Sequence, residues 1–126
     1  VYAVEAFTGK LLWKVRANPH PRTTITGSPR VFEGRVYVPL SSTEWASAAD
    51  PSYECCSFQG GVAAFDAATG ALAWRSYTIA EAPKPTGELN SAGARRIHPA
   101  GAPVWNSPTI DGKRRRLYVG TGEAYT

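Results

Sequence analysis

A chain of 126 residues with 43% hydrophobic and 19% charged side chains has the composition of one ordinary globular domain. No apolar run approaches the roughly 18 residues needed to cross a bilayer, so we expect no transmembrane segment. The net charge of +4 comes largely from Arg95-Arg96 and from residues 113–116. No aromatic side chains interleave with these charges, as a single-stranded nucleic-acid site would require. We therefore expect solvated turn charges and predict no nucleic-acid partner.

The first residues begin within a strand-like pattern. Val1-Tyr2-Ala3-Val4 alternates along an apolar segment and follows neither a Met nor a basic segment. We therefore expect the chain to be an excerpt of a longer protein, whose targeting signal cannot be identified from these residues.

An internal repeat relates the two halves of the sequence. Residues 1–14 align with residues 62–75, and seven of the 14 positions are identical. In the same order along the chain, residues 28–38 resemble residues 107–119. Two matched pairs in register indicate a repeat and make chance similarity an unsatisfactory explanation.

Each repeat contains four short segments rich in Val, Ile, Tyr, Phe and Trp, separated by turn residues, which predicts strands. In chain order the predicted strands cover residues 1–6, 11–16, 27–32, 36–41, 61–67, 71–77, 105–110 and 116–121. Four-stranded antiparallel units repeated radially are the blades of a β-propeller. The predicted fold is all-β, a propeller fragment of about two blades within residues 1–126. It comprises a half blade (1–16), a full blade (27–77) and a second half blade (105–121).

The predicted connections fall into two groups by length. The turns are short at residues 7–10, 33–35, 68–71 and 111–115, whereas the connections are long at residues 17–26, 42–60 and 78–104. Antiparallel strands send alternate connections to opposite ends, so all the long ones belong to one face. Long loops in compact domains commonly carry binding and catalytic residues. We therefore expect the chemistry at that face.

The two repeat segments, residues 1–13 and 61–74, resemble the repeat of pyrroloquinoline quinone (PQQ) dehydrogenases. Tyr53-Glu54-Cys55-Cys56-Ser57-Phe58, followed by residues 101–108, is similar to polyvinyl-alcohol dehydrogenases. The resemblance implies an eight-bladed periplasmic or outer-membrane-associated quinoprotein that holds PQQ and calcium, oxidises primary or secondary alcohols including polyvinyl alcohol, and passes electrons to cytochrome c. The chain alone would then be inactive, because other blades would hold further ligands. The alternative is a non-enzymatic scaffold, since the same repeat occurs in outer-membrane assembly lipoproteins.

Cys55 and Cys56 are the two cysteines of the chain and lie in a predicted long loop. Adjacent cysteines can close a disulfide ring, whose flat surface suits stacking of a planar quinone. In methanol-type quinoproteins a disulfide of this kind covers the cofactor, but it lies earlier relative to its repeat. In those quinoproteins an Arg also follows the cysteine pair, whereas residues 57–60 of this chain contain no arginine. The alternatives are two reduced thiols, or a disulfide that only stiffens the loop.

Trp105 stands where a long loop enters the innermost strand of a blade, so its ring could contact a flat cofactor or a polymer chain. An ordinary core tryptophan is the alternative. Trp13 and Trp74 occupy equivalent positions of the repeat, and this repetition favours packing between blades.

Four other side chains are candidate ligands at the same face. Glu123 follows the last predicted strand in a segment that resembles the Gly-Ala-Glu segment supplying a calcium carboxylate in methanol-type enzymes. Asn106 could add an amide oxygen, because calcium takes six to eight oxygen ligands. Arg95 and Arg96 share a long loop with His98 and could hold carboxylates of the quinone bidentately. Solvated loop charge is the alternative for both arginines.

The catalytic residues are not identified by the sequence. The resemblance implies that calcium polarises a quinone carbonyl and that an Asp acts as base. Three aspartates lack any motif that would single one of them out: Asp50, Asp66 and Asp111. No Ser-His-acid triad, phosphate-binding glycine loop or zinc pattern is recognisable.

Overall fold

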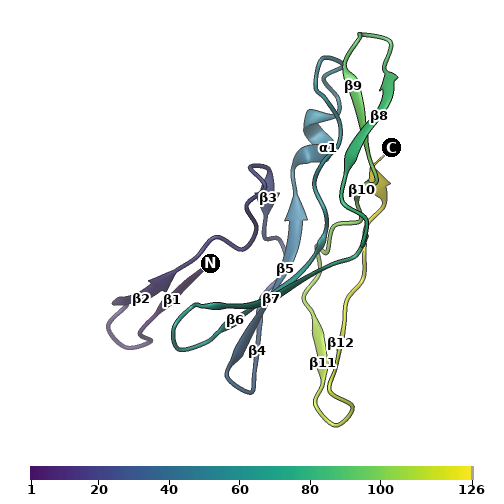
Figure 1. Ribbon diagram of the computed structural model, residues 1–126. Helices are drawn as coiled ribbons and strands as arrows, with labels where there is room; N and C mark the ends of the chain where they lie inside the picture. Colours follow the sequence, from purple (N-terminus) through teal and green to yellow (C-terminus); the bar gives the residue numbers. More distant parts are fainter. Residues whose placement is uncertain (126) are drawn as a thin grey trace.

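A central antiparallel sheet organises the chain in the computed structural model, which describes residues 1–125 (Figure 1). Four strands pair in chain order: β4 (Arg30–Phe32), β5 (Arg35–Ser42), β6 (Gly61–Asp66) and β7 (Leu72–Tyr77). A short strand, β3 (Thr23–Thr24), pairs with the end of β5. The predicted strands are therefore confirmed for this unit, in the consecutive antiparallel order of a propeller blade.

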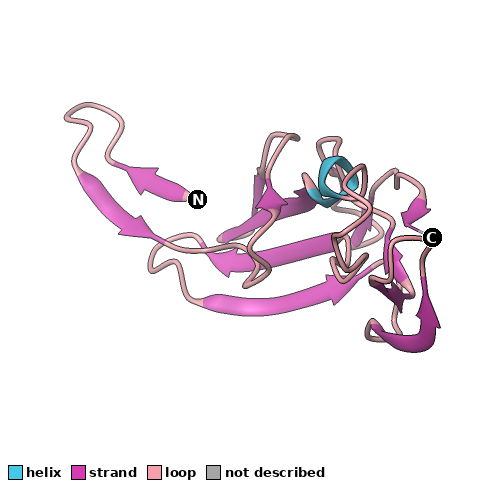
Figure 2. Cartoon of the chain, turned by 90° about the horizontal axis from the view of Figure 1, so that it is seen from above, coloured by secondary structure: helices cyan, strands magenta, loops and turns pink. Residues whose placement is uncertain are grey.

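Two hairpins flank the central sheet on opposite sides (Figures 1 and 2). The first pairs β1 (Tyr2–Val4) with β2 (Leu11–Lys14), and the second pairs β11 (Thr109–Asp111) with β12 (Arg116–Tyr118). All four strands are shorter than predicted; three fall inside the predicted ranges, and β11 extends one residue beyond the predicted range 105–110, to Asp111. The second hairpin begins at Thr109, so Trp105 precedes the strand in which it was expected.

The repeat is explained by the turns that follow β1 and β6. Glu5 accepts hydrogen bonds from the backbone N–H groups of Phe7 and Thr8, and Asp66 accepts them from Ala68 and Thr69. Both turns end on a glycine with positive φ, at +70° for Gly9 and +74° for Gly70. The acidic residue closes the turn and glycine supplies the left-handed conformation, which accounts for the repeated Thr-Gly.

Gly70 also packs against the neighbouring hairpin of β1 and β2. A Cβ atom at this position would lie 2.7 Å from Cδ2 of Trp13, and the Trp13 indole N–H donates to the carbonyl of Ala67 at 3.0 Å. Trp13 therefore packs between successive units, as predicted. Trp74, its counterpart in the central sheet, is 42% exposed and contacts Tyr37 at a centroid distance of 5.9 Å.

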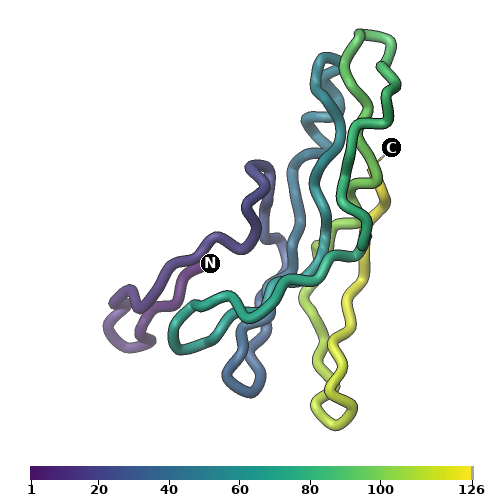
Figure 3. Tube along the Cα trace, in the orientation of Figure 1, coloured from purple at the N-terminus to yellow at the C-terminus, as the bar shows by residue number. Residues whose placement is uncertain are grey.

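The three long connections gather at one end of the central sheet, away from the short turns (Figure 3). They contain more regular structure than predicted. Helix α1 (Glu44–Ser47) lies in the second connection, and the third forms a hairpin of β8 (Lys84–Leu89) and β9 (Arg95–His98). Strand β10 (Ala100–Gly101) then pairs with β13 (Ala124–Tyr125). No helix among residues 1–125 has the length and apolar character required to span a bilayer.

The core lies between the central sheet and these connections. Its buried members are Ala17, Val38, Leu40, Phe58, Ala63 and Phe65. Phe58 belongs to the connection that carries the cysteines and is fully buried. Burying a phenylalanine stabilises by about 1.5–3 kcal/mol, so this side chain anchors the cysteine connection to the sheet.

Candidate functional site

Cys55 and Cys56 are joined as a disulfide in the connection between α1 and β6. Their backbone pairs with β9, since Ile97 N–H donates to the Cys55 carbonyl at 2.6 Å and Cys56 N–H donates to the Ile97 carbonyl at 2.8 Å. The segment thus forms part of a small ladder rather than a free loop. Cys56 is buried, whereas Cys55 is partly exposed and lines a pocket of about 130 Å³.

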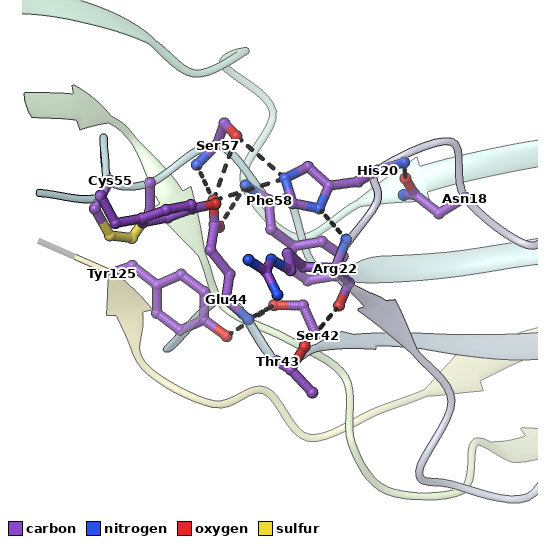
Figure 4. A network of polar contacts seen from close by, with 12 residues as sticks. Asn18, His20, Arg22, Ser42, Thr43, Glu44, Cys55, Ser57, Phe58 and Tyr125 are labelled. Carbon is purple, nitrogen blue, oxygen red and sulfur yellow. Dashed lines mark hydrogen bonds and ion pairs between the residues drawn. A yellow bond between two sulfur atoms is a disulfide. The ribbon is translucent and has the colours of Figure 1, made fainter. Parts of the chain in front are cut away.

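Glu44 is the main functional candidate that the sequence analysis missed. Its side chain is fully buried, and it lies directly beside the cysteine segment (Figure 4). Its Oε1 accepts from Ser57 N–H at 2.9 Å and from the Tyr53 hydroxyl at 3.1 Å. Its Oε2 accepts from Phe58 N–H at 2.8 Å. The Ser41-Ser42-Thr43-Glu44 segment signals the start of a helix, but no sequence pattern signals this burial.

His20 and Ser57 extend the network around Glu44. His20 Nδ1 accepts from Arg22 N–H at 3.2 Å, so the proton of the neutral ring is on Nε2, which lies 3.1 Å from Ser57 Oγ. Ser57 Oγ in turn donates to Glu44 Oε1 at 3.3 Å. Because Nε2 donates here, the ring cannot take the Ser57 proton. The three residues therefore form a structural relay and not a nucleophilic triad.

The surroundings of His20 and Tyr53, the two ring-bearing partners of Glu44, favour the uncharged form of each side chain. Burial lowers the pKa of His20, against the attraction of Glu44. Burial raises the pKa of Tyr53, and the Glu44 carboxylate raises it further. A neutral Tyr53 hydroxyl is a hydrogen-bond donor at neutral pH, as its contact with Glu44 requires.

Trp105 and Glu123 line a separate groove of about 580 Å³, together with Trp45 and Tyr125. The residues Trp45 and Trp105 are 66% and 61% exposed. Hydroxyl groups complete the lining: Thr24, Thr26, Ser41, Ser42 and Thr43. The groove therefore combines aromatic surface with hydroxyl groups at the end where the long connections gather.

Asn106 braces the backbone next to this groove. Its Nδ2 donates to the Gly120 carbonyl at 3.2 Å, and its Oδ1 accepts from Gly120 N–H at 3.3 Å. Glu123 is exposed. Among residues 1–125, no three His, Cys, Asp or Glu side chains come together as a metal cluster.

Arg95 and Arg96 lie beside Cys55 and His98 in the smaller pocket. The guanidinium group of Arg95 donates two hydrogen bonds of 2.8 Å to the carboxylate of Glu54. This pairing lowers the pKa of Glu54 and raises the pKa of Arg95. Arg96 Nη1 lies 3.7 Å from Oε2 of Glu88. The structure therefore groups the predicted residues in two places at one end of the fold: the disulfide with the arginines, and Trp105 with Glu123.

Comparisons with known proteins agree with this architecture. Residues 11–126 match the family described as the β-propeller domain of glucose, ethanol and alcohol dehydrogenases that use PQQ. The chain is 44% identical over 124 residues to a polyvinylalcohol dehydrogenase of a Sphingopyxis species, covering 98% of this chain and 19% of that protein. It is 34% identical over 130 residues to the quinohemoprotein alcohol dehydrogenase ADH IIB of Pseudomonas putida, covering 95% and 17%.

A solved structure of the quinohemoprotein alcohol dehydrogenase from Comamonas testosteroni superposes with a TM-score of 0.66 at 26% identity, covering 98% of this chain and 18% of that one. The chain thus spans about a fifth of the length of the relatives it matches. Both the predicted resemblance and the predicted propeller fold are confirmed. The chain belongs to the PQQ-dependent β-propeller family of glucose, ethanol and alcohol dehydrogenases.

Proposed function

We propose that this chain is part of a quinoprotein alcohol dehydrogenase that oxidises primary or secondary alcohols, including polyvinyl alcohol, with PQQ. The observation that carries the proposal is the Cys55–Cys56 disulfide, which is held by β9 at the end where the long connections gather. The identity of 44% to a polyvinylalcohol dehydrogenase supports the substrate. The relatives are bacterial quinoproteins, and we place the parent protein in the periplasm with cytochrome c as its electron acceptor.

Exposed apolar side chains support the presence of further blades. Phe7 is 98% exposed and Val31 69% exposed, on different hairpins, and Leu12 and Tyr2 on β2 and β1 are more than half exposed. Propeller blades bury such surfaces only against their neighbours. The parent protein, by which we mean the complete propeller that carries residues 1–126, would cover them.

The donor set around Cys55 fits an anionic planar quinone. The disulfide offers a flat surface, and the adjoining pocket is lined by Arg95, Arg96 and His98, whose nitrogen donors suit carboxylate groups. When bound, PQQ would accept the two electrons removed from the alcohol. The disulfide would orient it by stacking and the arginines by ion pairing, while the Trp105 ring, in the separate groove, would contact the polymer chain of the substrate. To bind the quinone, Arg95 would have to break its ion pair with Glu54 and form one with a carboxylate of the quinone.

Calcium would need residues beyond those described. It takes six to eight oxygen ligands, and residues 1–125 bring no three metal-binding side chains together. We propose Glu123 and Asn106 as two ligands and derive no step through the ion. We also assign no base, since the Asp50 carboxylate is engaged by Ser52, which lowers its pKa. Asp66 and Asp111 lie at the short turns.

Dye-linked turnover by the parent protein tests the proposal. The protein is reconstituted with PQQ and calcium, and dye reduction is followed with ethanol, 2-propanol and polyvinyl alcohol. We expect quinone binding and substrate-dependent reduction. A parent protein that neither binds PQQ nor reduces the dye would refute the proposal in favour of a non-enzymatic scaffold.

A further inference from the structure

The turn between β11 and β12 carries most of the chain's positive charge. From Asp111 to Arg116 it holds one carboxylate and four cations: Lys113, Arg114, Arg115 and Arg116. Its net charge of +3 accounts for most of the +4 of the whole chain. The four cations are exposed, and the turn projects from the end of the fold opposite the long connections (Figures 1 and 3). A strongly basic tip therefore points away from the disulfide.

The three other short turns serve as internal controls. The β4–β5 turn, the direct counterpart in the repeat, contains Glu33 and Arg35, and the β1–β2 turn contains Glu5 and Lys10, so each of these turns is neutral. The β6–β7 turn contains a single carboxylate, that of Asp66. Hairpins of this fold therefore form without a basic turn, and the basic run of the β11–β12 turn needs another explanation.

Three of the four cations have no counter-charge in the part of the chain that the structure describes. Arg114 is the exception, because its Nη1 donates to Oδ2 of Asp111 at 2.8 Å. No ion pair or side-chain hydrogen bond within residues 1–125 involves the other three: Lys113, Arg115 and Arg116. Glu33 lines the same cleft as the two unpaired arginines but is not within ion-pair distance of either. Burial of unpaired charges is costly, so we expect these side chains to stay at the surface of the parent protein.

Arg115 occupies a backbone position that does not favour an arginine. Its φ is +53°, in the left-handed region that glycine and asparagine adopt more readily. In the β4–β5 turn, Gly34 takes such a position with a φ of +70°. Since the turn geometry favours a smaller residue, the charge of the arginine explains its presence better than the fold does.

An extended anionic surface fits this turn better than a folded partner protein does. A stable protein interface buries about 800 Å² on each partner around an apolar core, whereas residues 112–116 consist of one glycine and four cations. Long cationic side chains at a projecting tip reach a flat layer of phosphate groups without a matching shape. Each Lys or Arg near an anionic bilayer strengthens binding by about fivefold. Three unpaired cations then contribute on the order of 100-fold, which gives reversible binding.

We propose that the β11–β12 turn binds the anionic phospholipid surface of a bilayer through Lys113, Arg115 and Arg116. The bound parent protein then has its long-connection end, with the Cys55–Cys56 disulfide, facing away from the lipid and open to a long polymer. The contact is electrostatic, so it weakens as added salt shortens the Debye length from about 10 Å at 0.1 M to about 3 Å at 1 M. It involves no quinone and can be tested separately from the proposed function.

Vesicle co-sedimentation of the parent protein tests the contact. Vesicles of phosphatidylglycerol are compared with vesicles of phosphatidylcholine, at ionic strengths of about 0.1 M and about 1 M. The turn variant combines three substitutions: Lys113→Gln, Arg115→Gln and Arg116→Gln. The matched control removes the same charge from exposed positions away from the short turns: Lys14→Gln, Arg16→Gln and Lys84→Gln. Unfolding midpoints are measured for every variant.

The single substitution Arg115→Asn separates the charge from the fold. Asparagine tolerates the left-handed conformation, so this variant loses one cation without strain in the turn. We expect it to bind phosphatidylglycerol vesicles about fivefold more weakly, with an unfolding midpoint no lower than that of the unsubstituted protein. Unchanged vesicle binding in this variant would contradict a contact through Arg115.

We expect the unsubstituted protein to bind phosphatidylglycerol vesicles at the lower ionic strength only, and not to bind phosphatidylcholine vesicles. The turn variant should bind on the order of 100-fold more weakly, and the control should change by less than about threefold, because distant charges are screened. No binding by the unsubstituted protein, full binding by the turn variant, or equal weakening in the control would each overturn the proposal. Binding of an acidic cytochrome c in place of vesicles, lost in the turn variant, would assign the turn to a protein partner instead.

Discussion

Substitution of Gly70 by alanine tests how the units of the fold pack together. Gly70 has a φ of +74°, and a Cβ atom there would lie 2.7 Å from Cδ2 and 2.9 Å from Cε3 of Trp13. Left-handed backbone costs an L-residue about 1–2 kcal/mol, and overpacking adds about 1–3 kcal/mol. We therefore expect Gly70→Ala to lower the free energy of unfolding by about 2–5 kcal/mol.

A matched glycine separates these two costs. Gly34 has a φ of +70° and open space where a Cβ would lie, so Gly34→Ala should cost only the backbone strain of about 1–2 kcal/mol. The free energies are measured by denaturant-induced unfolding of the parent protein. A double-mutant cycle with Trp13→Leu then assigns the clash, because Gly70→Ala should cost less once the indole is gone. Equal costs for Gly70→Ala and Gly34→Ala, or no coupling to Trp13, would refute the packing argument.

Three further predictions concern the candidate site. Replacing Cys55 and Cys56 together by alanine should weaken PQQ binding at least tenfold, measured by titration; unchanged affinity would exclude stacking on the disulfide. Asn106→Leu should destabilise by about 1–3 kcal/mol, because Gly120 loses both partners, and an unfolding midpoint equal to that of the unsubstituted protein would contradict this. Burial lowers the folded-state pKa of His20, so the unfolded chain protonates first as the pH falls. Stability should then decrease below about pH 6.5, with a shallower decrease in His20→Gln; parallel pH profiles would show that His20 is not responsible.

The strands were predictable because their residues carry local signals. The repeated Thr-Gly turns, the paired tryptophans and the β-branched segments each specify a conformation from neighbouring residues alone. The hairpin β8–β9 was missed because every residue of β8 is exposed, so the strand shows no alternation between buried and exposed positions. Its turn does carry a signal, since Asn90 accepts from Ala92 and Ala94 N–H groups and Gly93 has a φ of +83°.

The candidate site was predictable only in part. The adjacency of Cys55 and Cys56 is a property of the sequence, and it directed attention to the connection between α1 and β6. The contacts of Glu44 join residues 13 and 14 positions apart through a fold that the sequence does not display. A charged residue is expected at the surface, so its complete burial follows from tertiary structure. The pairing of Arg95 with Glu54 likewise depends on the ladder between β9 and the cysteine segment.

A crystal structure of the parent protein with PQQ and calcium tests the central claim most directly. The account predicts that the quinone ring lies in van der Waals contact, about 3.5–4 Å, with the disulfide of Cys55 and Cys56, at the end of the blades where the long connections gather. A quinone bound at the short-turn end, or one that leaves this disulfide untouched, would contradict it.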